Sequence, residues 1–333
     1  MLMKTLWKSA QLPFFDECHV GLRLASAIRK IVSKGTRLMK DQAFDSLVLT
    51  SDNGPALIGG YFLAKKMRLP YSLIFFDPYM GNNLGWFPNL AAWAFQPKLL
   101  KNAQHVIVCG NSLITSLRRQ VDREYLSLPI SVEVPEMPPN FAQVNPTTFR
   151  ILYTGAVYWA NADAIRSFVE AIQTLRGVEF LVYSPQSKED LARMGVKEGE
   201  HVRFGFLPKK ELSEFQRSID LLYLPLSFSE ESRKVVELAT ASKICEYMTS
   251  GRPILIHAPD YAYIVHYAQS ENFAHVITTI DPEEIRNNLS MLIGNSGYRR
   301  RLAENAWRIV KDHHDAKKNS NILSVVLSPG STS

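Results

Sequence analysis

Residues 242–253 read S-K-I-C-E-Y-M-T-S-G-R-P and lead directly into the apolar run Ile254-Leu255-Ile256. Lys243 and Glu246 are three residues apart, a spacing that places both side chains on one face of a helix. Ser242 stands where such a helix would begin, and Gly251 where it would end. A helix start favours a phosphate, and Glu246 could accept hydrogen bonds from sugar hydroxyls. The stretch therefore suits a nucleotide diphosphate sugar, although a surface ion pair with a glycine cap gives the same pattern.

The length and composition are those of a two-domain globular protein. The chain has 333 residues, more than one hydrophobic core usually supports. The sequence contains no run of eighteen apolar residues that would predict a membrane-spanning helix. Residues 1–15 do not resemble a secretory signal. The cysteines Cys18, Cys109 and Cys245 have no paired spacing. These features predict a cytoplasmic protein with reduced thiols.

Positive charge is concentrated in the N-terminal half of the chain. Residues 1–149 contain 16 Lys and Arg against 10 Asp and Glu, whereas residues 150–333 contain 22 of each. Such a half is either simply solvated or meets something anionic, and a peripheral contact with the inner face of a membrane is one interpretation. The basic residues are dispersed and no nucleic-acid motif accompanies them, so nucleic acid is not an expected partner.

Residues 150–318 predict a doubly wound parallel sheet. Short apolar runs alternate there with amphipathic helical segments, and the runs lie at 150–154, 178–183, 201–204, 220–224, 252–257 and 274–278. Nearly continuous apolar strands separated by helices indicate a parallel sheet covered on both faces. Ligands of such a domain are expected at the carboxyl ends of its strands.

Residues 1–128 predict a shorter domain of the same α/β class. Its apolar runs lie at 46–50, 71–76 and 105–108. A complete domain of this class opens with a strand, but the first thirty residues contain no apolar run, so the first strand is predicted to be missing. Residues 1–15 are interpreted as a basic amphipathic segment or an irregular arm. The proline-rich residues 129–149 are predicted to link the two domains.

Several common motifs are absent from the sequence. It contains no Gly-x-Gly-x-x-Gly, no Walker A loop, no Cys-x-x-Cys and no His-Glu-x-x-His. Dinucleotide, P-loop and zinc sites of the usual kinds are therefore not supported. An Asp-x-Asp pair is also absent, so we expect neither a metal nor a cofactor besides the substrate itself.

The motifs that are present share the order and spacing of one known family. They are Lys243-x-x-Glu246-Tyr-Met with Gly251-Arg-Pro253, Tyr153-Thr-Gly155, Gly205-Phe206 and 300–306, with weaker matches between 63 and 112. Together they resemble the retaining group 1 glycosyltransferases with the GT-B fold. The resemblance implies two doubly wound domains facing across a cleft, a donor domain at 150–318, and a segment at 319–333 that returns toward the N-terminal domain.

The resemblance also implies roles for individual residues. Glu246 would bind the donor ribose, and Lys243 with the N–H groups near Ser242 would face the diphosphate. Gly155 would let the diphosphate approach the loop after the first strand of the donor domain. The base would lie at the turn of Gly205 and Phe206.

Two positions depart from the family pattern. Leu238 stands where many members have a second glutamate, with Glu237 one residue off register. Tyr158 and Asn161 occupy the loop that usually carries an Arg and a Lys, and we expect them to line the donor site. Asp77 and Asn111, at predicted strand ends, are the candidates for activating the acceptor, and Asp77 is placed with Lys243 and Glu246 among the catalytic residues.

The sequence therefore predicts a glycosyltransferase. It would move a sugar from a nucleotide diphosphate sugar to a glycan or lipid-linked acceptor, with retention and without a metal. The shortened N-terminal domain and the two departures leave two alternatives open. One is a non-catalytic partner or scaffold subunit of this fold, and the other is a sugar-nucleotide epimerase with the same architecture.

Overall fold

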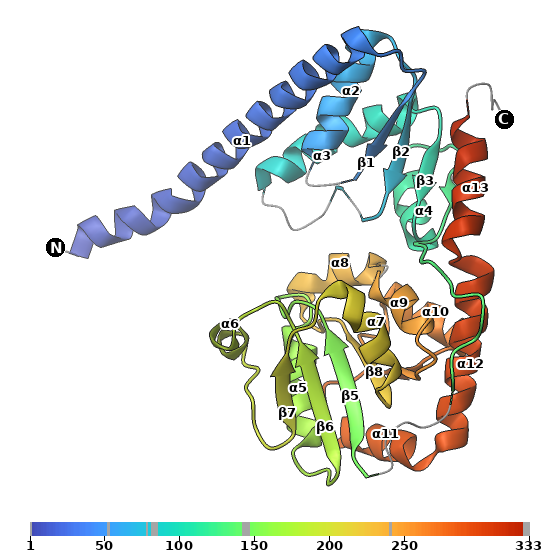
Figure 1. Cartoon of the computed structure of the whole chain (residues 1–333). Helices are drawn as coiled ribbons and strands as arrows, with labels where there is room; N and C mark the ends of the chain where they lie inside the picture. Colours follow the sequence, from blue (N-terminus) through green and yellow to red (C-terminus); the bar gives the residue numbers. More distant parts are fainter. Residues whose placement is uncertain are drawn as a thin grey trace. The chain divides into compact units, whose positions relative to one another are not determined.

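The computed structural model describes residues 2–51, 54–77, 79–80, 86–141, 147–239 and 242–328, with side chains from residue 20 onward. The chain divides into two compact units. The N-terminal unit comprises Met1–Pro129 and Ser320–Ser333, and the C-terminal unit comprises Ile130–Asn319 (Figure 1). The N-terminal unit is therefore built from both ends of the chain.

The C-terminal unit is a six-stranded parallel sheet between two layers of helices. Its strands are β5 Phe149–Thr154, β6 Val178–Tyr183, β7 Val202–Gly205, β8 Leu221–Pro225, β9 Ile254–His257 and β10 His275–Ile277. Its helices are α5 Ala162–Ile172, α6 Lys188–Arg193, α7 Lys209–Arg217, α8 Arg233–Leu238, α9 Lys243–Met248, α10 Tyr263–Glu271, α11 Pro282–Gly294 and α12 Ser296–His313, with the 3-10 turn η1 Glu230–Ser232 before α8.

Successive side chains of the strands enter two different hydrophobic clusters, one on each face of the sheet of the C-terminal unit. In β5, Ile151 and Tyr153 enter one buried cluster together with residues of α5 and α11. Leu152, between them, enters the other cluster with residues of α9, α10 and α12. Successive side chains of a strand point to opposite faces, so a continuously apolar strand fills both layers.

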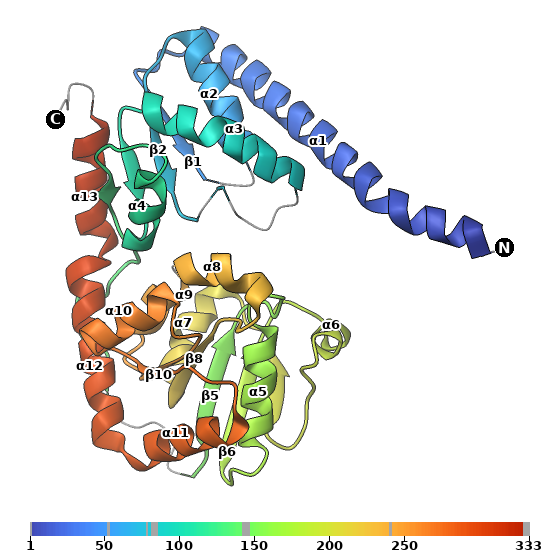
Figure 2. The same cartoon turned by 180° about the vertical axis from the view of Figure 1, so that it is seen from behind.

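The strand order of the C-terminal unit reverses once, between β5 and β8. The order is β10-β9-β8-β5-β6-β7, so the connections run one way from β5 to β7 and the other way from β8 to β10. At such a reversal the loops after the two central strands diverge and leave a crevice at their carboxyl ends. In both views α8, which follows β8, lies at the opposite end of this unit from α11 (Figures 1 and 2).

The N-terminal unit has a four-stranded parallel sheet of order β1-β2-β3-β4. Its elements are α1 Leu2–Asp41, β1 Leu47–Thr50, α2 Pro55–Met67, β2 Tyr71–Phe75, α3 Trp86–Asn102, β3 Val106–Val108, α4 Asn111–Arg118 and β4 Leu126–Ser127. Every crossover moves in the same direction, and β1 is at the edge of the sheet. Within the described residues no strand precedes β1.

The last helix, α13 Ala316–Leu327, crosses from the C-terminal unit into the N-terminal one. Val325 and Val326 line a cavity of the N-terminal unit together with Arg118 and Leu126. At the other end of the crossing, Val132 N donates to His314 O, and Ala316 N donates to Val132 O, both at 2.9 Å. The two segments that connect the units are thus hydrogen-bonded to each other.

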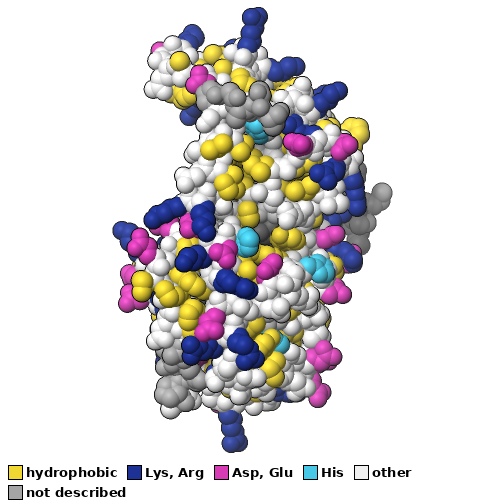
Figure 3. All heavy atoms as spheres, turned by 90° about the vertical axis from the view of Figure 1, so that its right-hand side faces the viewer, with side chains coloured by type: hydrophobic (Ala, Val, Ile, Leu, Met, Phe, Trp, Pro, Cys, Tyr) yellow, Lys and Arg dark blue, Asp and Glu magenta, His cyan; other side chains and the backbone are white. Residues whose placement is uncertain are grey.

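The predicted α/β class with two parallel sheets is confirmed. Of the two interpretations of residues 1–15, the irregular arm is excluded for residues 2–15, because α1 is continuous from Leu2 to Asp41. Gly21 and Leu24 are buried on its inner side, where α1 packs against α2 and α3. Within the described residues, no helix is both long and apolar enough to span a membrane. On the face in Figure 3, acidic and basic side chains are interspersed over the C-terminal unit.

Candidate functional site

The loop after β5 is a rigid turn at the strand-order reversal. Gly155 has φ +122, a conformation that residues with a Cβ rarely adopt, and its N–H donates to Tyr183 O at 2.8 Å. Asn161 Nδ2 donates to Tyr153 Oη at 2.9 Å and to Ala156 O at 3.1 Å. Its Oδ1 accepts from the backbone N–H of Tyr158. These bonds occupy the buried Asn161 side chain, so its position favours shaping the loop over the direct donor contact that the sequence predicts.

Lys243 lies directly over Gly155, although the two residues are 88 positions apart. A Cβ added at Gly155 would overlap Nζ and Cε of Lys243. The ammonium also lies 5.2 Å from the centre of the Tyr153 ring. Burial lowers the pKa of Lys243, and the Glu246 carboxylate partly opposes that shift. A partly desolvated cation therefore faces a backbone turn that no side chain blocks.

The helix that carries Lys243 is shorter than the sequence predicts. α9 contains six residues and ends at Met248, because Thr249 Oγ1 donates to Glu246 O and Ser250 Oγ to Tyr247 O. Ser242 precedes the helix but has helical dihedrals and makes no side-chain cap. So short a helix adds little dipole, and charge for a diphosphate would come from the Lys243 ammonium instead.

Gly251 closes the turn after α9. Its φ is +74, and a Cβ there would lie 2.6 Å from Cγ of Pro139. Only glycine thus satisfies both the left-handed backbone and the close approach of residues 139 and 140. The predicted role of Gly251 as a stop signal is correct, although it lies three residues beyond the last helical residue.

Tyr247 joins α9 to β5, a role that the sequence did not indicate. Its side chain is fully buried, and its Oη lies 3.2 Å from Thr154 N and 3.0 Å from Thr154 Oγ1. These two hydrogen bonds between Tyr247 and Thr154 fix α9 against β5, the strand that leads into Gly155. Neighbouring helical residues point in different directions, so a helix that directs Glu246 to the cavity directs Tyr247 toward the core. This spacing could have indicated the buried position of Tyr247.

Glu246 faces a cavity of about 480 Å³ that also includes Ser242 and Lys209 in its lining. Lys209 Nζ lies 3.8 Å from Glu246 Oε1. Lys209 is the first residue of α7, three positions after the exposed Phe206, so the predicted base turn leads into a contact with the predicted ribose ligand. Sequence reasoning missed Lys209, which has no spacing relation to Glu246.

Gly205 ends β7, at the edge of the sheet. A Cβ at this position would overlap the Tyr183 ring, which stacks on Phe215 with centroids 4.7 Å apart. The glycine is therefore required for packing. Phe206, which follows it, is left exposed beyond the strand end, where a planar ligand could stack on it.

The first departure from the family pattern lies at the end of α8. Leu238 is half-buried at the end of α8, and Glu237 is exposed. Arg233 pairs with Glu230 at 3.3 Å and lies 4.4 Å from the centre of the Tyr261 ring. These contacts hold one cation on the segment that follows β8, at the carboxyl edge of the sheet.

Tyr158 lies on the other side of the strand-order reversal. Its ring packs edge-on against Trp159 at 5.9 Å, and both side chains are exposed. The loops after β5 and β8 meet where Ser227 N donates to Ala160 O at 2.7 Å. The loop therefore presents aromatic side chains in place of the usual cations.

Asp77 follows β2 and belongs to the N-terminal unit. Its backbone N–H and that of Phe76 donate to Ser51 Oγ. Partial desolvation raises the pKa of its carboxyl group. The structure groups Gly155, Lys243 and Tyr153 in one cluster, and Asp77 is not part of it.

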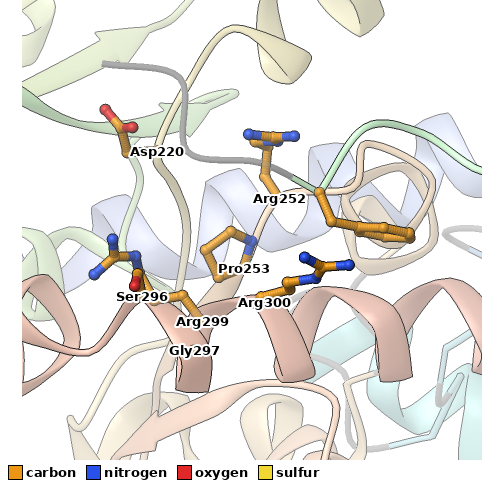
Figure 4. Close-up of a pocket in the computed structure, with 8 residues that line it drawn as sticks. Asp220, Arg252, Pro253, Ser296, Gly297, Arg299 and Arg300 are labelled. Atoms are coloured by element: carbon orange, nitrogen blue, oxygen red, sulfur yellow. The ribbon is translucent and has the colours of Figure 1, made fainter. Parts of the chain in front are cut away.

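A second cavity of the C-terminal unit, about 400 Å³, lies at the amino ends of the strands, since Asp220 and Pro253 in its lining directly precede β8 and β9. Figure 4 shows Asp220, Arg252, Pro253 and Arg299 around it. Arg252 Nη2 donates to Asn140 O, and Arg299 Nη1 donates to Ile293 O at 2.6 Å and to Leu292 O. Both guanidinium groups are engaged by backbone carbonyls of the linker and of the end of α11, where they stabilise the fold. We therefore do not assign this cavity to the donor. Among the described residues, no three His, Cys, Asp or Glu side chains are placed to hold a metal.

Comparison with known proteins finds a family model that matches the C-terminal unit. Residues 148–295 match the family model described as "Glycosyl transferases group 1". No curated protein sequence matches the chain.

Solved structures share the fold over most of the chain. Sucrose-phosphate synthase from Thermosynechococcus elongatus is 13% identical, with a TM-score of 0.69 over 89% of this chain and 76% of that one. OtsA is 11% identical, with a TM-score of 0.68 over 91% and 77%. Anabaena HepE, solved with UDP-glucose, is 15% identical, with a TM-score of 0.65 over 88% and 81%. Residues 148–295 thus match the model of the group 1 glycosyltransferases, and the fold of the chain is that of the GT-B structures.

Proposed function

We propose that the chain transfers a sugar from a nucleotide diphosphate sugar to a glycan or lipid-linked acceptor. The observation that carries this proposal is the Lys243 ammonium set over Gly155 at the strand-order reversal. A crevice at that point is where doubly wound domains bind ligands. The solved relatives support the substrate class, since HepE was crystallised with UDP-glucose and a TarM variant with UDP, fondaparinux and alpha-GlcNAc-glycerol.

Lys243 would stabilise the leaving diphosphate. Breaking the bond between the sugar and the diphosphate places negative charge on the phosphate oxygens, and a cation held ready in a low-dielectric site stabilises that charge. Gly155 leaves the backbone open, so the diphosphate can approach between the loop and the ammonium. With this cation in place, the departure of the diphosphate would not require a metal. Retention of configuration is the outcome that the resemblance to the retaining group 1 enzymes implies.

Glu246 would hold the nucleoside end of the donor. Its carboxylate faces the 480 Å³ cavity and can accept hydrogen bonds from two neighbouring ribose hydroxyls. Lys209, 3.8 Å away, would orient that carboxylate, and the exposed Phe206 ring would stack on the base. Tyr158 and Ser242 would complete the lining of the donor site.

The N-terminal unit would receive the acceptor. We assign to Asp77 the activation of the acceptor hydroxyl, because it is a strand-end carboxylate whose pKa is raised by desolvation. The excess of basic residues in 1–149 suits a lipid-linked acceptor presented at an anionic membrane. The protein would then act on the cytoplasmic side, in peripheral contact with the inner membrane face.

Isothermal titration calorimetry with UDP-glucose, ADP-glucose and GDP-mannose tests the donor site. At least one donor should bind the full chain, and Glu246→Ala should weaken it about 10-fold or more, since a charged hydrogen-bond acceptor is lost. Glu237→Ala is the matched control, because this glutamate is exposed nearby and should not alter binding. Full affinity in the Glu246→Ala protein would remove the ribose assignment.

A non-catalytic role remains the second candidate, favoured by Leu238 at the position of the family's second glutamate. Product analysis by NMR separates the possibilities. Transfer to an acceptor, with the anomeric configuration of the donor kept and with EDTA present, supports the proposal. Donor binding without transfer or hydrolysis would indicate a scaffold, and epimerised free donor would indicate an epimerase.

A further inference from the structure

The exposed side of α1 is a basic ridge. Every ionisable side chain between Val20 and Lys40 is a cation, and all of them are exposed: Arg23, Arg29, Lys30, Lys34, Arg37 and Lys40. The inner side is apolar and packed, with Ile31 against Gly59 and Leu63 against Gly35. We call these six residues the α1 ridge. Its cations have no acidic neighbours within that stretch of the helix.

The outer side of α3 is apolar as well as its inner side. Trp86, Leu90 and Trp93 are 53%, 50% and 68% exposed, and their spacing places them on one face. The opposite face, with Ala92 and Leu99, is buried. A helix that is apolar all round normally has a partner on both sides. We call Trp86, Leu90 and Trp93 the α3 stripe.

The helices that carry the α1 ridge and the α3 stripe are in direct contact near their N-terminal described residues. A Cβ at Gly21 of α1 would lie 2.9 Å from the Phe87 ring, and that ring packs against Trp86 at 5.8 Å. Leu22 and Arg23 follow Gly21 and are both exposed. Aromatic, aliphatic and cationic side chains thus gather on one unit, beside this contact.

We propose that the α1 ridge and the α3 stripe form the surface by which the protein docks on an anionic lipid bilayer. Tryptophan prefers the boundary between headgroups and acyl chains, where its ring is apolar and its N–H is hydrated. Lysine and arginine beside it meet the negative potential of anionic headgroups. Six cations without an acid complement an anionic surface, and the exposed tryptophans of the α3 stripe favour a lipid bilayer over an acidic protein. The inference rests on the proposed membrane-presented acceptor and names the residues that reach that membrane.

Vesicle co-sedimentation of the full chain tests the surface. The protein should bind phosphatidylcholine vesicles that contain phosphatidylglycerol at least about 10-fold more tightly than pure phosphatidylcholine, and added salt should reduce the difference. A triple variant, Lys30→Gln, Lys34→Gln and Arg37→Gln, should lose about 100-fold in this affinity. The charge-matched control is Lys197→Gln, Lys210→Gln and Lys311→Gln on the C-terminal unit, which should bind as the parent does.

The α3 stripe is tested separately with Trp86→Ser and Trp93→Ser together. This variant should lose at least about 10-fold in vesicle affinity, since two buried indole rings are removed from the interface. Its control is Met137→Ser, an exposed apolar residue of the C-terminal unit. Lipids brominated near the headgroup should quench the tryptophan fluorescence of the parent more than that of the double variant.

Donor titration of the same variants separates this inference from the proposed function and from misfolding. Loss of vesicle binding with unchanged nucleotide-sugar affinity supports the docking surface. Equal binding to neutral and anionic vesicles, no binding by the parent, or unchanged binding by both variants would overturn it. Binding of a soluble anionic polysaccharide but of no vesicle would overturn it too and would identify the ridge as a glycan site.

Discussion

The two sheets of this protein are both parallel, yet only one of them reverses its strand order. In the C-terminal unit the connections diverge at β5 and β8, and Gly155 and Lys243 meet at that point. In the N-terminal unit β1 to β4 follow one another in a single direction, with β1 at the edge. The described N-terminal sheet therefore has no crevice of this kind. A ligand site of the same design is expected in one unit and not in the other.

The strongest test of this difference is a side chain at Gly155. Gly155→Val should lower donor affinity about 1000-fold, because the branched chain displaces the Lys243 ammonium and strains a φ of +122. Titration calorimetry measures the loss. Gly177→Val is the control, since φ there is +71 but the nearest atom, Thr147 O, lies 3.5 Å from the added Cβ. Equal losses in both variants would show that backbone strain, and not Lys243, is responsible.

A change at Asp77 tests what the N-terminal unit contributes. Asp77→Asn should lower kcat about 100-fold, the usual effect of removing a general base, while donor affinity stays unchanged. Steady-state kinetics and calorimetry on one preparation give both values. Asp45→Asn, an exposed residue before β1, is the matched control. An unaltered kcat would show that Asp77 does not activate the acceptor and has only a structural role at the end of β2.

Acid should weaken the C-terminal unit before the N-terminal one. Burial lowers the pKa of His257 from 6.5 to about 4, and burial also lowers the pKa values of His275 and His314 in the same unit. Since the folded pKa lies below the unfolded one, this stability is complete above pH 6.5 and decreases as the pH falls toward 4. At pH 5 His257 alone should cost about 2 kcal/mol. Urea unfolding between pH 7 and 5 measures the slope.

The His257→Gln protein should show a shallower pH slope. His266→Gln, at an exposed position of α10, should keep the slope of the parent. A slope that is the same in all three proteins would place the acid sensitivity elsewhere.

The smallest expected effect comes from Lys209. Its side chain is 90% exposed, so its ion pair with Glu246 is well screened. Lys209→Ala should weaken donor binding only about two-fold, as an exposed pair contributes little. Fluorescence titration with a labelled nucleotide can resolve such a change, with Lys210→Ala as the control. A loss comparable to that of Glu246→Ala would mean that Lys209 contacts the donor itself.

The sequence predicts the C-terminal unit better than the N-terminal one. Its central strands β8 and β9 are buried throughout, and a buried parallel strand is a nearly continuous apolar run that can be recognised locally, as at 254–257. The edge strand β1 and the two-residue β4 leave weaker patterns. The sequence pattern also leaves open whether residues 1–15 are helical, whereas in the structure they are part of α1, which extends to Asp41 and packs against α2 and α3.

The candidate site, too, is predicted only in part by the sequence. The meeting of Lys243 with Gly155 is implied by a family pattern, since no local rule relates residues 88 positions apart. The position of Asn161 in the family's cation-bearing loop predicts it as a ligand, but its side chain is hydrogen-bonded to Tyr153 and Ala156. The early end of α9 depends on the side-chain hydrogen bonds of Thr249 and Ser250, which compete with the helix.

The double crossing of the chain between its units sets an order of assembly during synthesis. Residues 130–319 emerge from the ribosome as one uninterrupted segment and can form their sheet at once. The N-terminal unit is translated before this segment, yet Val325 and Val326, which line its cavity with Arg118 and Leu126, are translated after it. The wall of that cavity is therefore complete only after the whole C-terminal unit has been made, and the hydrogen bonds of Val132 with His314 and Ala316 hold the late segment beside the early one.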